Sequence, residues 1–217
     1  MRSLVQPAVI RSAGIAALLT AFACYPRLRS GTLGEHQLWF VWLTLAWAAF
    51  ILWSFVLAWH QKYTGQNVLE IARRPALWIV ATLCGLVGAA VLYFGFDPVL
   101  RPVIPQEYPG SIRSWIVMTL FLLAFDQLFL CFAPFAFFIR LLRNEKLAMT
   151  LTVLFGIVLA YLKIQQSRHD FRTTFVVAMC AWRMVAGGIS IILYRRGGVW
   201  VAWWCTLLVQ TRHLLTL

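Results

Sequence analysis

The stretch that decides the fold is WIVMTLFLLAFDQLFLCFAPFAFFI, residues 115–139. It is almost unbroken in its apolar character and is longer than the roughly 20 residues that a helix needs to cross a bilayer. Asp126 and Gln127 nevertheless lie near its middle. The stretch therefore predicts a membrane-spanning helix that carries a carboxylate and an amide at depth.

The composition of the whole chain supports the same class. Its 217 residues are 62% hydrophobic and only 12% charged, whereas a soluble domain carries about 25% charged residues. Several other long apolar runs accompany residues 115–139. We therefore predict an all-α, polytopic transmembrane helix bundle.

Hydropathy and turn residues divide the chain into about seven expected spans, with Pro26 and Asp97-Pro98 as the stops of the first and third. A short interfacial helix is expected around QNVLEIARRPA, residues 66–76. No repeat or linker divides the chain, so residues 1–217 are expected to form a single integral membrane domain. The expected spans are residues 5–25, 38–60, 77–96, 115–139, 147–162, 174–194 and 199–215.

The charge balance points to membrane lipids and not to nucleic acid. The chain has 19 Lys and Arg against 7 Asp and Glu, a net charge of +12. These basic residues fall in short loops between apolar runs, where they orient the protein and contact anionic headgroups.

The cysteines and histidines predict no cofactor chemistry. None of the five cysteines forms a C-x-x-C pair, and no two of the four histidines share a helix at metal-ligand spacing. His60 is expected at the interfacial end of its span. We therefore expect no metal and no cofactor, although the deeper Trp42, Trp47 and Trp53 leave contact with protein, lipid or a bound cofactor open.

Two full charges lie near the middle of expected spans, Asp126 in the fourth and Arg183 in the sixth. A charge at the bilayer centre costs at least about 2.5–3.5 kcal/mol on insertion scales, so such residues face the bundle interior and pair. We expect an Asp126–Arg183 ion pair that binds the two helices together. Gln127 is expected to hydrogen-bond across a helix interface.

The C-terminal half resembles a known family. FDQLFLCFAPFAFFIRLLRNEK (125–146) and AGGISIILYRRGGVWVAWWCTLLVQ (186–210) are similar to the CPBP intramembrane proteases, the CAAX-prenyl-protease and bacteriocin-processing, or Abi, family. The best stretch is YRRGGVWVA, residues 194–202. The resemblance implies a CPBP-like four-helix core in residues 115–217, preceded by variable helices in residues 1–114.

The catalytic positions of that family are changed in this sequence. The resemblance aligns the glutamate pair and arginine of the first core helix with Asp126, Gln127 and Cys131. The phenylalanine and histidine of the second fall on Phe155 and Leu159. The histidine and asparagine of the last core helix fall on Thr206 and Gln210.

The resemblance therefore implies a pseudoenzyme. Loss of one oxyanion donor typically costs about 10²–10³ in rate, and here several donors are lost. The leading hypothesis is a scaffold, assembly factor or accessory subunit for an integral membrane partner in a bacterial inner membrane. Its polar lining would be Asp126, Gln127, Arg183, Thr206 and Gln210.

Two alternatives stay open at this point. One is an active intramembrane endopeptidase in which Asp126 is the base. The other is a small subunit of an energy-transducing complex that contacts lipid, quinone or pigment through its aromatic residues.

Overall fold

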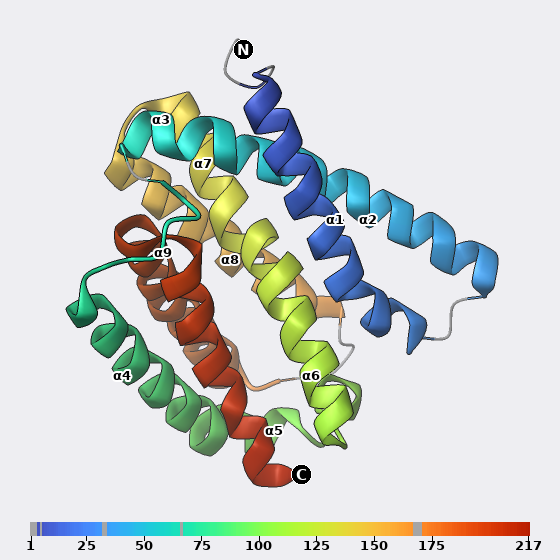
Figure 1. The fold of residues 1–217 in the computed structure, drawn as a ribbon. Coiled ribbons are helices and arrows are strands. Elements are labelled where there is room, and N and C mark those ends of the chain that lie inside the picture. Colours follow the sequence, from blue (N-terminus) through green and yellow to red (C-terminus); the bar gives the residue numbers. More distant parts are fainter. Residues whose placement is uncertain (1–3, 5, 32–33, 66, 167–170) are drawn as a thin grey trace.

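The computed structural model describes residues 4, 6–31, 34–65, 67–166 and 171–217. Within these ranges the regular structure is helical (Figure 1), and six helical stretches are long and apolar enough to cross a membrane. The predicted all-α polytopic bundle is confirmed, and the chain is an integral membrane protein. The six stretches are Pro7–Arg29, Glu35–Thr64, Pro75–Leu100, Ile112–Leu142, Glu145–Gln166 and Thr173–Thr216.

Several stretches are built from consecutive helical elements of different pitch. The α-helices are α1 (Pro7–Arg29), α2 (Glu35–Phe55), α3 (Gln61–Thr64), α4 (Pro75–Val91), α5 (Asp97–Leu100), α6 (Ile112–Phe121), α7 (Ala133–Leu142), α8 (Glu145–Gln166) and α9 (Thr173–Gln210). The wider π-helical turns are η1 (Val56–His60), η2 (Leu92–Phe96), η4 (Leu122–Asp126) and η5 (Leu128–Phe132). Short 3₁₀ turns are η3 (Pro105–Glu107) and η6 (Thr211–Thr216).

The prolines do not end helices where the sequence predicts. Pro26 lies inside α1, which continues to Arg29. Its missing N–H removes the one backbone bond that would reach the Phe22 carbonyl, and the helix nevertheless continues for three more residues. Pro98 occupies the first turn of α5 directly after the π-helical turn η2, a position where its missing N–H costs little.

The expected sixth and seventh spans are the two arms of α9. Gly198 has φ 73° and ψ −168° inside this element. A methyl group built on Gly88 of α4 would lie 3.1 Å from Val209 and 3.8 Å from Trp182. A straight helix would separate those two residues by about 40 Å, so α9 reverses at Gly198 into two antiparallel arms.

The segment before α4 covers this reversal. Residues 67–74 are not helical, so the expected interfacial helix is absent from that range. Val199 N–H donates to the Val68 carbonyl at 3.0 Å, and the Trp200 indole donates to the Leu69 carbonyl at 3.0 Å. The backbone at Val68 and Leu69 is thereby used to bind the α9 turn and not to form a helix.

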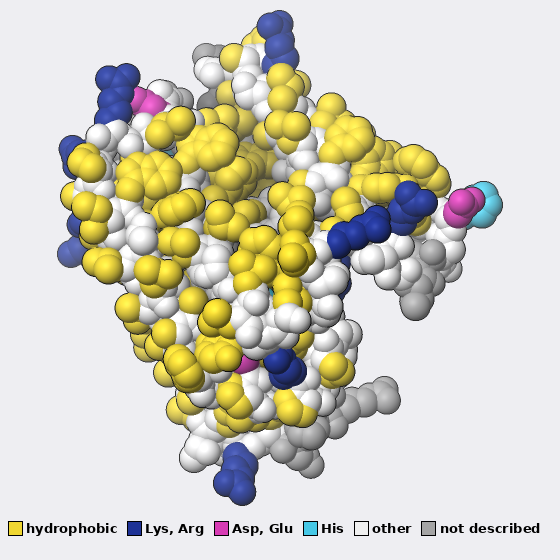
Figure 2. All heavy atoms as spheres, turned by 60° about the horizontal axis from the view of Figure 1, so that its bottom comes forward, with side chains coloured by type: hydrophobic (Ala, Val, Ile, Leu, Met, Phe, Trp, Pro, Cys, Tyr) yellow, Lys and Arg dark blue, Asp and Glu magenta, His cyan; other side chains and the backbone are white. Residues whose placement is uncertain are grey.

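Small residues and aromatic side chains shape the packing. Gly85 and Gly88 let α4 lie directly against the second arm of α9, beside which it runs in Figure 1. The main core surrounds the fully buried Phe132, Phe135 and Tyr194. Apolar side chains cover much of the face seen in Figure 2, and many large apolar side chains are exposed, as contact with lipid requires.

Helices α1 and α2 form an antiparallel arm that projects from one side of the bundle (Figure 1). Two tryptophans of α2 donate hydrogen bonds to α1. The Trp53 indole donates to Thr20 Oγ1 at 3.0 Å, and the Trp42 indole donates to the Ala21 carbonyl at 2.9 Å. The arm is therefore held together by hydrogen bonds as well as by apolar contact.

Gly198→Ala is expected to destabilise the protein by about 1–3 kcal/mol, because the backbone angles at this position are essentially restricted to glycine. The new methyl group would also lie 2.6 Å from the Val68 carbonyl oxygen. Thermal unfolding of the purified protein in mild detergent measures the loss.

Gly188→Ala is the matched control within the same element. A methyl group at Gly188 has no neighbour within 4 Å, and alanine favours a helix over glycine. Equal melting temperatures for the two variants would contradict the role assigned to the Gly198 turn.

Candidate functional site

Polar residues in the bundle interior lie next to π-helical turns. Turn η1 ends at His60, η4 ends at Asp126, η5 contains Cys131, and Asp97 directly follows η2. A π-helical turn inserts one residue into the helical repeat and is frequent at functional sites. These turns therefore determine which polar side chains face the interior.

Asp126 and Arg183 lie within electrostatic range of each other but form no contact ion pair. Among the described residues, the ion pairs within 4.0 Å are Lys163–Glu107, Arg195–Glu145 and Arg212–Asp97. The expected Asp126–Arg183 contact pair is therefore not formed, although the two charges are close enough to interact electrostatically.

The Arg183 side chain lies against α8. Its buried Nε has no hydrogen-bond partner in the part of the chain that the structure describes. A methyl group on Gly156 would lie 3.7 Å from this Nε, so the glycine leaves room for the guanidinium between α8 and α9. Cys131 of η5 is also within electrostatic range.

The side-chain oxygen of Gln127 does not make the expected hydrogen bond across a helix interface. Its buried Oε1 has no partner among the described residues. Beside it, Phe129 packs edge-to-face on Phe155 of α8 at 5.8 Å. The residue aligned with the family's motif phenylalanine therefore lies next to the Asp126–Gln127 segment.

Thr206 and Gln210 are engaged within their own helix end. The Thr206 hydroxyl donates to the Ala202 carbonyl at 3.0 Å. The Gln210 Oε1 accepts from Arg212 Nη1 at 3.5 Å, and the Gln210 carbonyl accepts from the Trp115 indole at 2.8 Å. Neither side chain hydrogen-bonds to Asp126 or Gln127 in the described structure.

A buried histidine and tyrosine complete the interior. His60 and Tyr194 are both 0% exposed, with ring centroids 4.5 Å apart. Phe132 stacks on Tyr194 at 4.4 Å. Neither imidazole nitrogen of His60, nor the Tyr194 hydroxyl, has a hydrogen-bond partner among the described residues.

The prediction that His60 ends its span is wrong, because the helical stretch continues beyond it to Thr64. The imidazole is buried in the bundle against Phe135 and Tyr194, and its position at the membrane interface stays a prediction. A signal for Tyr194 is present in the sequence, since it opens the stretch YRRGGVWVA, but nothing in the sequence pairs it with His60.

Together these side chains form what we call the buried polar row: Gln127, Cys131, Arg183, Tyr194 and His60. An unpaired buried donor or acceptor costs about 1–3 kcal/mol, so a row of them calls for a functional explanation. Among the described residues, no group of three or more His, Cys, Asp or Glu is placed to hold a metal ion. The row can supply hydrogen bonds and charge to a polar group of another molecule.

A second polar cluster lies at the opposite end of the bundle. Arg212 Nε is 3.1 Å from Asp97 Oδ2, and the Tyr108 hydroxyl donates to Asp97 Oδ1 at 3.0 Å. Burial, followed by the charge of Asp97, raises the pKa of Tyr108, so the hydroxyl stays protonated as a donor. This cluster closes the helix ends around residues 97–108 and 212, and its polar groups satisfy one another.

The chain was compared with protein-family models, curated proteins and solved structures, and nothing matches it in any of the three. The candidate site is therefore argued from its own geometry.

Asp97→Asn is expected to destabilise the protein by about 3–5 kcal/mol, since it leaves the Arg212 guanidinium without its buried counter-charge. Both side chains of this pair are only 11–12% exposed. Urea or thermal unfolding in detergent, followed by tryptophan fluorescence, measures the change.

Glu107→Gln is the matched control at the same end of the bundle. It removes the Lys163–Glu107 pair, whose side chains are 66% and 37% exposed, and such pairs contribute about 0–1 kcal/mol. If both variants lost the same stability, the Asp97 pair would not be the stabilising contact.

Proposed function

We propose that this protein is a catalytically degenerate, CPBP-like protein of a bacterial inner membrane. It works by binding a membrane-embedded segment of a partner protein, as a scaffold, assembly factor or accessory subunit. The observation that carries the proposal is the pair of partly buried charges, Asp126 and Arg183, which interact electrostatically without forming a contact ion pair within the described chain.

The cost of buried charge supports a binding role. Ionisable residues inside a membrane are costly to bury and mark functional sites when they are retained. A polar or charged group on a partner helix would complete the hydrogen bonding of Arg183 Nε and Gln127 Oε1, which have no partner within the described chain. Binding of that partner then recovers part of the cost of burying these groups.

The positions that would have to assist hydrolysis argue against cleavage. Water activation requires a base and preorganised donors around the reacting carbonyl. The Thr206 hydroxyl is bound to its own helix, and the Gln210 side chain accepts from Arg212. Asp126 and the Cys131 thiol are then the ionisable groups left among the positions that the resemblance marks as catalytic.

The experiment places a photo-crosslinking amino acid at Phe129, a side chain 39% exposed and three residues from Asp126. Crosslinking in native membranes is compared for the wild type, Asp126→Asn, Arg183→Gln and the charge-exchanged double variant Asp126→Arg/Arg183→Asp. We expect one stoichiometric adduct in the wild type that falls at least tenfold in both single variants.

The double variant separates the possible roles of the two charges. Loss of the adduct in the double variant supports recognition by an external partner, because the exchange preserves an internal attraction. Restoration of the adduct would mean that the charges act only on each other. A peptidase would instead yield cleaved partner fragments that disappear in Asp126→Asn, and that result would overturn the binding proposal.

A further inference from the structure

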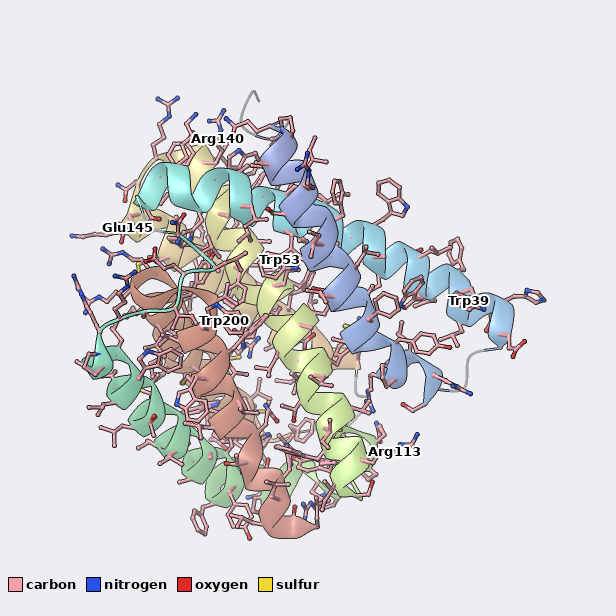
Figure 3. All side chains as sticks on the ribbon, viewed as in Figure 1. Trp39, Trp53, Arg113, Arg140, Glu145 and Trp200 are labelled. Atoms are coloured by element: carbon pink, nitrogen blue, oxygen red, sulfur yellow. The ribbon has the colours of Figure 1, made fainter. Side chains whose placement is uncertain are left out.

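A basic pocket lies between the last turn of α1 and the first turn of α6, two helices that pack together. Its volume is about 600 Å³, within the range of small-molecule sites. Figure 3 shows Arg113 at the opposite end of the bundle from Arg140 and Glu145. The polar residues that line the pocket include Tyr25, Arg27, Arg29, Ser111, Arg113 and Ser114.

The charges of this pocket are of one sign. Arg27, Arg29 and Arg113 line it, and none of the described acidic side chains does. None of the three guanidinium groups belongs to an ion pair within 4.0 Å among the described residues. Guanidinium groups bind phosphate through paired N–H donors in a planar fork.

Arg113 occupies a position where a cation is unfavourable. It is the second residue of α6, whose first turn contains no acidic residue. The N-terminus of a helix carries a partial positive charge, which repels a cation and attracts an anion. In the Ser111–Ser114 capping box, the Ser111 side chain accepts a hydrogen bond from the Ser114 backbone N–H at this helix end. The capping box brings no negative charge. An anion between the three arginines would remove the repulsion.

Neighbouring aromatic residues place the pocket at the depth of lipid headgroups. The Tyr25 ring, which lines the pocket, lies 6.3 Å from Trp39 and 6.4 Å from Trp42. Tryptophan and tyrosine gather at the membrane–water interface. On the bilayer side, the exposed Ile116 and Leu120 of the same helix provide apolar surface for an acyl chain.

We propose that this pocket binds a phosphate group, presented by the headgroup of an anionic phospholipid. The three arginines hold the phosphate oxygens, and the first turn of α6 adds its dipole. This site is separate from the buried polar row, so the proposal does not depend on the binding role given above.

The test uses the purified full-length chain in detergent with phosphatidylglycerol, phosphatidylcholine or inorganic phosphate added. Native mass spectrometry measures retained lipid, and thermal unfolding measures protection. The variant is Arg27→Gln/Arg29→Gln/Arg113→Gln. The control, Arg140→Gln/Arg143→Gln/Lys146→Gln, removes the same charge from the last turn of α7, the connection that follows it and the first turn of α8.

We expect the wild type and the control to retain phosphatidylglycerol over phosphatidylcholine, and the pocket variant to lose at least tenfold in affinity for it. Protection by inorganic phosphate equal to that by the lipid would support the phosphate site but identify a soluble ligand as its occupant. Equal losses in the pocket variant and the control would overturn the proposal, because binding would then follow net charge alone.

Two further variants keep the result interpretable. Arg113→Gln alone tests the site if the triple variant fails to fold, and an unchanged preference for phosphatidylglycerol in that variant would contradict the proposal. Arg113→Lys keeps the charge but removes the planar fork, so an intermediate affinity is expected. Wild-type affinity for the lysine variant would argue against paired hydrogen bonding to phosphate.

Discussion

The C-terminal bundle depends on the tight reversal of α9 at Gly198. Backbone groups inside a membrane protein must find partners within the protein, and a single glycine makes this turn with little interruption of the helical ladder. The Val68 carbonyl completes it by accepting from Val199 N–H. Because the two arms then lie side by side against α4, the positions of Arg183 and Tyr194 relative to the rest of the core follow from this turn.

The polar groups of the interior are of two kinds: some hydrogen-bond to one another, and others have no partner within the described chain. At one end of the bundle, the Asp97 carboxylate accepts hydrogen bonds from the Arg212 guanidinium and the Tyr108 hydroxyl. This cluster has a structural role. In the middle and toward His60, buried donors and acceptors have no partner within the described chain. His213 Nδ1, beside Tyr108 at the first end, is likewise buried without a partner in the described chain, so unpaired groups are not confined to one region of the bundle.

The helices and their class could be predicted from the sequence because twenty-residue apolar runs admit little else in a bilayer. The burial of His60 could not be predicted, because it depends on η1 and on contact with Tyr194, which lies 134 positions later in the chain. The ends near Pro26 and Pro98 were predicted wrongly for two reasons: proline is tolerated in a first helical turn, where Pro98 lies, and the loss of one backbone hydrogen bond at Pro26 does not stop α1. Asp126 and Arg183 were recognised as interior charges from depth alone, but their separation depends on side-chain geometry that hydropathy does not contain.

The π-helical turns have a consequence for comparing this chain with others. In η5 the backbone hydrogen bonds connect residues five apart, as between Ala133 N–H and the Leu128 carbonyl. A motif spacing taken from a regular helix would thus fall out of register across this segment. A correct alignment with a relative that lacks these turns would need a one-residue gap in the middle of a helix, where gaps are ordinarily penalised.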